Sequence, residues 1–124
     1  MATEEIHLRQ AKHNEQFLDT FDLSTTPYLD WVVTVIFCAA LHYIRALAAR
    51  HHFGNVSSHA DMDRIFSRVP VFRRQPDVYV DYRQLKDDSR AARYDARQFS
   101  PREVVELQDE EFQRIRVFVV ARLN

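Results

Sequence analysis

Glycine is almost missing from this chain, which has one among 124 residues, together with only four prolines. Tight hairpins and phosphate-cradling loops rely on residues that accept a positive φ, and glycine is the usual one. Alternating apolar and polar residues, the pattern of half-buried strands, are also hard to find. We therefore expect an all-α protein. The length fits a single domain, residues 1–124, with one hydrophobic core.

Cysteine is equally scarce, and neither sign of charge is in large excess. The lone Cys38 cannot form an internal disulfide, and its place in an apolar segment predicts a small buried hydrophobe. A formal net charge of −1 gives no overall field that would attract nucleic acid. Residues 1–10 have neither the basic region nor the apolar region of a signal peptide, so we expect a cytoplasmic protein.

The most apolar segment covers residues 32–44, in which only Thr34 and His42 are polar. A helix that is apolar on nearly every side belongs at the centre of a protein. The segment is shorter than the roughly 20 apolar residues that cross a bilayer, so we predict no membrane span.

Capping residues and prolines divide the chain into four main helices. The first is expected over about residues 4–19. The second starts at Ser24-Thr25-Thr26-Pro27 and continues to about residue 52, before a stop at Gly54-Asn55. Apolar residues at mixed three- and four-residue steps predict the inward face of the first helix: Ile6, His13, Phe17 and Phe21.

Similar signals place the remaining helices. Ser58-His59-Ala60-Asp61 resembles a capping box and starts a short helix that Pro70 interrupts or ends. Pro76 starts the third main helix, and Ser100-Pro101-Arg102-Glu103, the clearest capping box in the chain, starts the last. Short connections predict an antiparallel up-and-down four-helix bundle, with an extra short helix between helices two and three. One stripe of the last helix is expected to face inward: Val105, Phe112, Ile115 and Val119.

Charge is unevenly distributed along the chain. Residues 1–30 carry six acidic and two basic side chains, a net of −4, whereas residues 64–102 carry ten basic against five acidic, a net of +5. Arginine makes up 15 of the 17 basic residues, and its planar guanidinium suits phosphate and carboxylate. Residues 64–102 therefore predict either a basic binding face or an ordinary solvated surface.

Several segments together resemble a known family. They are HLRQAKHNEQFLD in the first helix, YLDWVVTVIFCAALHYIRALAA in the second, SSHADMDRI after it, and YRQLKDDSRAARYDARQFS in the third main helix. In these segments the chain resembles small prokaryotic proteins of the HEPN (higher eukaryotes and prokaryotes nucleotide-binding) superfamily, over about residues 7–120. The resemblance implies an up-and-down four-helix bundle that pairs as a symmetric dimer. Members include metal-independent RNases of toxin–antitoxin and defence systems, and non-catalytic partners of nucleotidyltransferases.

The RNase members resemble one another in an arginine followed, four to six residues on, by a histidine. A histidine near its ordinary pKa can move a proton at the ribose 2′-hydroxyl, and an arginine can stabilise the charge that grows on the phosphate. This chain departs from the pattern, because no histidine follows His59. The spacing occurs once, from Arg45 to His51 and His52, across the end of the second helix and away from the family's usual place. With 15 arginines and six histidines, one or two such spacings are expected by chance, so the match predicts either a catalytic pair or a coincidence.

Two sets of residues are candidates for chemistry. For acid–base catalysis they are His42, Arg45, His51 and His59. For binding phosphate or nucleic acid they are Arg64, Arg90, Arg93, Tyr94 and Arg97. If the end of the second helix folds near residues 89–94, the two sets would meet in an anion pocket made of His59, Arg64, Arg90 and Arg93.

Each histidine also has a simpler interpretation. His42 is explained equally by a buried imidazole with a satisfied hydrogen bond, and otherwise faces a cleft with Tyr94, Arg90 or Asp30. His51 fits a helix C-terminus, where the dipole favours a partly positive ring, and His59 fits a helix start. A metal site through Cys38 and His42 lacks a third ligand, so we predict neither a metal nor a cofactor.

Two functions follow from these observations. The first is a non-catalytic HEPN-like homodimer that binds a protein partner, or the phosphate of a nucleotide or RNA, through residues 64–97. The second is a metal-independent RNase that uses His42, His51 or His59 with a nearby arginine. The missing downstream histidine favours the first. The second requires a histidine and an arginine that reach one phosphate in an open cleft.

Overall fold

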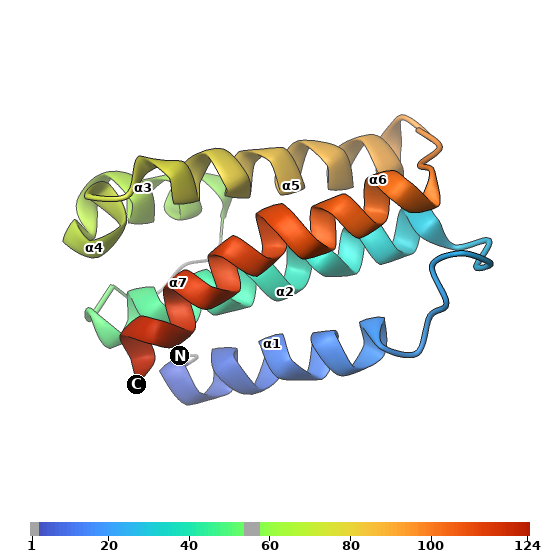
Figure 1. The fold of residues 1–124 in the computed structure, drawn as a ribbon. Helices are drawn as coiled ribbons and strands as arrows, with labels where there is room; N and C mark the ends of the chain where they lie inside the picture. The colour runs from blue at the N-terminus through green and yellow to red at the C-terminus, as the bar shows by residue number, and fades with distance from the viewer. Residues whose placement is uncertain (1–2, 54–57) are drawn as a thin grey trace.

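The computed structural model describes residues 3–53 and 58–124, which form helices joined by turns, with no strand among them. This confirms the all-α class. The elements are α1 (Glu4–Leu18), α2 (Leu29–Arg50), α3 (His59–Arg68), α4 (Pro70–Arg73), α5 (Pro76–Tyr94), α6 (Pro101–Glu106), the π-helical segment η1 (Leu107–Phe112) and α7 (Gln113–Leu123). The last three follow one another without a break and form one continuous helical rod (Figure 1).

α2 lies at the centre of the molecule and packs against α1, α5 and α7. The long helices alternate in direction, so both ends of the chain lie at the same end of the molecule (Figure 1). Val33, Ile36 and Leu47 of α2 are fully buried. The prediction that the most apolar segment forms the central helix is therefore confirmed.

The full length of α2 bears on the membrane prediction. The helix has 22 residues and a mean hydropathy of 1.9 over its most apolar window, so by length and composition it is able to cross a membrane. However, 67% of that window is buried inside the molecule, and the core helix of a soluble protein passes the same test. α2 is therefore weak evidence for a membrane span.

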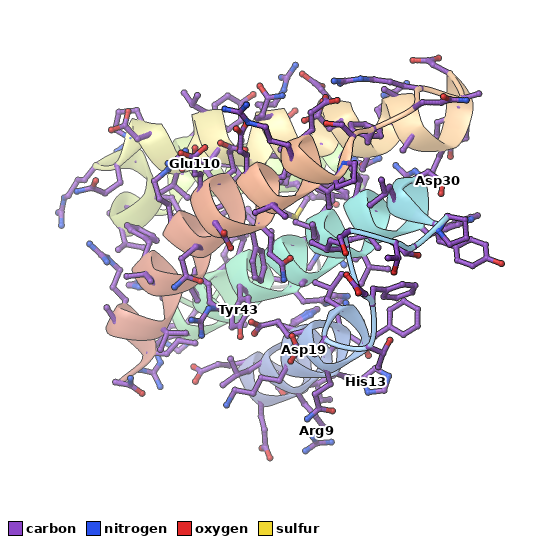
Figure 2. The ribbon with its side chains drawn as sticks, turned by 45° about the vertical axis from the view of Figure 1, so that its right-hand side comes forward. Arg9, His13, Asp19, Asp30, Tyr43 and Glu110 are labelled. Atoms are coloured by element: carbon purple, nitrogen blue, oxygen red, sulfur yellow. The ribbon has the colours of Figure 1, made fainter. Side chains whose placement is uncertain are left out.

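The inward face of α1 differs from the predicted stripe. Ile6 and Phe17 keep 49% and 47% of their surface exposed, and His13 points away from the other helices (Figure 2). Ala11 and Leu18 are the buried residues of α1. The prediction was therefore wrong for the positions within α1, by about a third of a turn, whereas Phe21, just after the helix, packs against the core as predicted.

The reason is a polar contact that a search for apolar residues does not see. The Glu15 carboxylate on α1 accepts a hydrogen bond from the Tyr43 hydroxyl on α2 and lies 3.7 Å from the Arg116 guanidinium on α7. Burial and the carboxylate together raise the pKa of Tyr43 well above its usual value. Turning Glu15 toward α2 and α7 turns Ile6 and Phe17 outward.

Predicted helix starts are confirmed at α3, α5 and α6. The Ser58 hydroxyl oxygen accepts a hydrogen bond from the Asp61 N–H at 3.1 Å, and Pro76 lies in the first turn of α5. Ser100 and Glu103 form the capping box of α6, each side chain accepting the other residue's N–H.

Pro70 ends the short helix, as predicted, and also starts another one. α3 ends at Arg68, and Pro70 begins a separate helix, α4. Pro70 fits the first turn of a helix because its missing N–H is unpaired there in any case. Between α2 and α5 the described residues therefore contain two short helices, not the single one predicted.

The start of α2 differs from the sequence prediction, whereas its end at Arg50 lies close to the end predicted at about residue 52. The helix begins at Leu29, not at Pro27, because the Thr26 hydroxyl oxygen accepts a hydrogen bond from the Tyr28 N–H (3.1 Å) and holds residues 26–28 in a turn. The predicted stop at Gly54-Asn55 lies outside the described residues.

The observed end of α2 is a Schellman motif. His52 has a φ of 62°, and its N–H donates to the Ala49 carbonyl oxygen at 3.0 Å. The next N–H, that of Phe53, donates to the Ala48 carbonyl oxygen at 2.9 Å. A histidine thus takes the left-handed position that glycine usually occupies.

The last rod contains an irregularity that changes which residues face inward. η1 is π-helical, and its buried residues Leu107 and Phe112 are five positions apart. An α-helix would return to the same face after three or four residues, so η1 absorbs one extra residue. Val104 is fully buried and Val105 is 40% exposed, which makes the predicted inward position of Val105 wrong.

Candidate functional site

α5 carries different charges on its two sides. On one side Asp81 accepts two hydrogen bonds from Arg114 of α7, at 2.9 and 2.8 Å. The other side carries Lys86, Arg90 and Arg93 at helical spacing, three to four residues apart. The fold therefore pairs the acidic side of α5 internally and leaves its basic side available.

The basic side of α5 forms a pocket with the start of α3. The pocket has a volume of about 370 Å³ and is lined by His59, Arg90, Arg93 and Tyr94, which we call the arginine pocket. His59 is the first residue of α3 and follows the cap Ser58, so the helix start places its ring beside α5. Residues that lie far apart in the sequence thus come together at one site.

The cations of the arginine pocket are not neutralised. Neither Arg90 nor Arg93 forms an ion pair with any acidic residue that the structure describes. The Arg93 guanidinium lies 5.3 Å from the centre of the Tyr94 ring, which is 75% exposed. Arg93 also donates to the Ser89 hydroxyl at 3.4 Å. Two guanidinium groups without acidic partners among the described residues, beside an exposed aromatic ring, can bind a phosphate and stack a base.

The electrostatics of His59 reflect this surrounding. Its pKa is lowered by partial burial and by the positive charges of Lys86, Arg90 and Arg93, against a smaller opposite effect of Asp63. The lowered pKa favours the neutral imidazole, which has a lone pair available to accept a proton or a hydrogen bond.

Arg64 and Arg97 belong to the predicted binding set but lie outside the arginine pocket. Arg64 donates to the Asp61 carboxylate at 2.7 Å, within α3. Arg97 donates to the carboxylates of Asp88 and Glu103, at 2.8 and 2.6 Å. Both guanidinium groups are occupied by acidic neighbours; the pair of Arg64 lies within one helix, whereas Arg97 links the end of α5 to α6.

His42 makes a contact that the sequence did not predict. Its Nδ1 lies 3.1 Å from Nδ1 of His7 on α1, and the two rings stack with centroids 5.3 Å apart. Burial, His7 and Arg45 lower the pKa of His42 to about 4. His7 was missed because no spacing rule connects α1 to the middle of α2.

Arg45, the predicted partner of the catalytic histidines, is half-buried on the same side of α2. Its Nε is enclosed and has no hydrogen-bond partner within residues 3–53 and 58–124, and burial lowers the pKa of its guanidinium. Cys38 lies on the same side of α2, four residues before His42, and is also half-buried, which is less than predicted. Burial raises the pKa of its thiol. His51 is exposed at the end of α2, where its backbone N–H donates to backbone carbonyl oxygens of the last turn.

Arg45 and His51, the pair predicted from their spacing, therefore lie in different surroundings: Arg45 is half-buried within α2, and His51 is exposed at its end. The arginine pocket is the place where a histidine and free arginines meet. Within the described residues, no group of three His, Cys, Asp or Glu side chains is arranged to hold a metal ion.

Comparison of the chain with family models, with curated proteins and with solved structures finds no match. The geometry of the site, and the sequence resemblance described above, are therefore what supports a function.

Proposed function

We propose that this protein is an HEPN-like helical module that binds the phosphate of RNA or of a nucleotide in the arginine pocket. The observation that carries the proposal is the meeting of Arg90 and Arg93, free of acidic partners, with His59 and the exposed Tyr94 ring. Arginine binds phosphate through paired N–H donors, and an aromatic ring beside it supplies a stacking surface for a base.

The proposal extends to the assembly. The alternating long helices fit an antiparallel up-and-down four-helix bundle with α3 and α4 inserted between its second and third helices. By its resemblance to HEPN proteins we place the chain in a cytoplasmic, prokaryotic toxin–antitoxin or defence system. There it acts as a homodimer, with a nucleotidyltransferase or another defence protein as its partner.

The binding experiment uses a fluorescent single-stranded RNA and the purified protein, with affinity measured by anisotropy over a series of salt concentrations. Arg90→Gln and Arg93→Gln each remove one charged hydrogen-bonding group, so each is expected to weaken binding about tenfold and to lower the salt dependence. Arg83→Gln is the matched control, because Arg83 is an exposed arginine of α5 outside the pocket. Equal effects of all three substitutions, or no binding of RNA or of nucleotides, would contradict the proposal.

A second function, metal-independent RNA cleavage, is favoured by the lowered pKa of His59 beside two arginines. The neutral imidazole would take the proton of a ribose 2′-hydroxyl, whose oxygen then attacks the adjacent phosphorus. The bond to the 5′-oxygen breaks, that oxygen takes a proton from water, and a 2′,3′-cyclic phosphate remains. Arg90 and Arg93 would stabilise the charge on the phosphate oxygens.

Cleavage is tested with RNA in EDTA, and the product ends are analysed for cyclic phosphate. His59→Ala is expected to abolish cleavage, whereas His13→Ala, at an exposed histidine on the outer side of α1, is expected to leave it unchanged. Parallel His42→Ala and His51→Ala variants identify the base if it is one of those residues. Binding without cleavage by the wild-type protein would leave the binding module as the function.

A further inference from the structure

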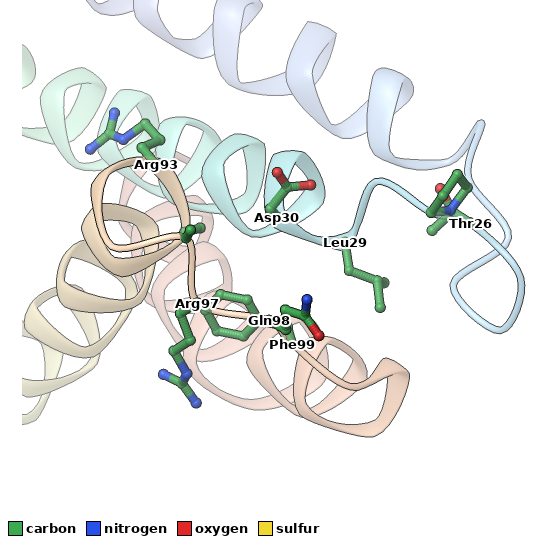
Figure 3. Close-up of a pocket in the computed structure, with 10 residues that line it drawn as sticks. Thr26, Leu29, Asp30, Arg93, Arg97, Gln98 and Phe99 are labelled. Atoms are coloured by element: carbon green, nitrogen blue, oxygen red, sulfur yellow. The ribbon is translucent and has the colours of Figure 1, made fainter.

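A second cavity adjoins the arginine pocket. It has a volume of about 600 Å³ and lies between the loop before α2 and the loop after α5 (Figure 3). This size falls within the roughly 300–1,000 Å³ of small-molecule sites. Arg93 lines both this cavity and the arginine pocket, so a ligand held by Arg93 can extend into either. We call it the Asp30 cavity, and its lining includes Thr26, Leu29, Asp30, Arg93, Gln98 and Phe99.

Beyond Arg93, which it shares with the arginine pocket, the Asp30 cavity offers hydrogen-bond acceptors and no further arginine without an acidic partner among the described residues. Arg97 also lines it, but its guanidinium is held by the carboxylates of Asp88 and Glu103. The Asp30 carboxylate, in the first turn of α2, has no hydrogen-bond or ion-pair partner among the residues that the structure describes. The cavity therefore suits a group that carries O–H or N–H donors, and it does not suit a second phosphate.

Its walls also include apolar surface. Leu29 is partly buried and Phe99 is 8% exposed, and both line the cavity. A ligand part that combines a flat, weakly polar ring with hydroxyl groups matches this lining, and a nucleoside has both.

Resting on the proposed function, we propose that the Asp30 cavity binds the nucleoside attached to the phosphate held by Arg93, with the Asp30 carboxylate accepting a hydrogen bond from the ribose 2′-hydroxyl. Carboxylates in nucleotide-binding proteins commonly accept such a bond. DNA lacks that hydroxyl, so it leaves the Asp30 carboxylate without a donor. The ligand is then single-stranded RNA and not DNA.

The test compares the affinities of a short single-stranded RNA and its deoxy counterpart of matching sequence, measured by anisotropy. The wild-type protein is expected to prefer RNA about tenfold or more, the effect of one hydrogen bond to a charged group. Asp30→Ala is expected to remove that preference. Asp109→Ala, which removes the same charge at an exposed position of η1, is expected to keep it.

Removing an acidic residue strengthens the binding of any nucleic acid, because it removes a negative charge. This effect is the same for RNA and DNA, so it cancels in the ratio of the RNA affinity to the DNA affinity. A 2′-O-methyl RNA tests the same hydrogen bond on the unaltered protein, and it is expected to bind like DNA. Equal wild-type affinity for RNA and DNA, a preference that survives in Asp30→Ala, or a 2′-O-methyl RNA that binds as tightly as RNA would each overturn the Asp30 assignment. In those cases sensitivity to Arg90→Gln would still support phosphate binding, whereas absence of RNA binding would overturn both.

Discussion

Nδ1 of His7 on α1 lies 3.1 Å from Nδ1 of His42 on α2, across stacked rings inclined by 30°. One nitrogen has to donate and the other to accept, so at least one of the two rings must keep a lone pair. Burial and the nearby Arg45 lower the pKa of both histidines, and the value for His42 falls to about 4. Two protonated rings could not form this hydrogen bond, because neither ring would have a lone pair to accept it.

The first prediction is that acid weakens the fold through this pair. His42 has a pKa of about 4 in the folded state against 6.5 for an ordinary histidine, so the unfolded chain takes up the proton first as the pH falls. The free energy of unfolding should then decrease between pH 7 and pH 5, with a His42 share of about 1 kcal/mol after allowance for solvent screening of the half-exposed ring. Urea denaturation at pH 7 and at pH 5 measures this change in the free energy of unfolding.

The control separates His42 from other titrating groups. His42→Gln should reduce the loss of stability between the two pH values, whereas His13→Gln, at an exposed position of α1, should leave the loss as in the wild type. A His42→Gln protein with the full wild-type pH dependence would contradict this account.

Local signals in the sequence located most helix boundaries, and the predicted inward residues Phe112, Ile115 and Val119 of the last helix are buried, but the predicted face of α1 is wrong. The capping box of Ser100 with Glu103 and the proline at residue 76 were predicted correctly, because caps depend on neighbours within one turn. The face of α1 was not, because Glu15 turns inward to reach Tyr43, a residue of another helix. Contacts between helices have no signature in a single sequence.

The candidate site shows the same division. The arginine-rich segment was visible in the sequence, but the arginines that remain free were not. Arg97 is neutralised by Asp88, nine residues earlier, and by Glu103, six residues later, across the turn that joins α5 to α6. Asp30 belongs to a cavity that exists only because two loops meet at one end of α2.

The second prediction concerns the extra residue in η1. Deletion of Glu110, an exposed residue of the π-helical segment, should convert it to a regular helix and leave Phe112 and Ile115 facing inward. Deletion of Val117, in the regular helix α7, should rotate the following residues by about 100° and expose Val119. Thermal denaturation should show a small loss of stability for the first variant and a large loss for the second. Equal losses would show that η1 does not absorb the extra residue.

The third prediction uses the backbone of Ala96, which has a φ of 52° just after α5. A left-handed conformation costs a residue with a Cβ about 1 kcal/mol relative to glycine, so Ala96→Gly should stabilise the protein by about that amount. Ala91→Gly, inside α5, should destabilise it by about 1 kcal/mol, because glycine is a poor helix former. Changes of the same sign in the two denaturation midpoints would contradict the prediction.

The last prediction is that an anion reverses the charge environment of His59. In the free protein Lys86, Arg90 and Arg93 help to lower the pKa of its imidazole. A phosphate bound in the arginine pocket places negative charge beside the ring, which favours the imidazolium, so the pKa of His59 should rise on addition of inorganic phosphate or a short RNA. NMR titration of the imidazole protons measures it, with His13 as the internal control whose titration curve should not change. Arg90→Gln should raise the pKa of His59 without phosphate, because one neighbouring cation is gone, and should reduce the further rise that phosphate causes. A His59 titration curve that phosphate leaves unmoved would show that the anion binds elsewhere.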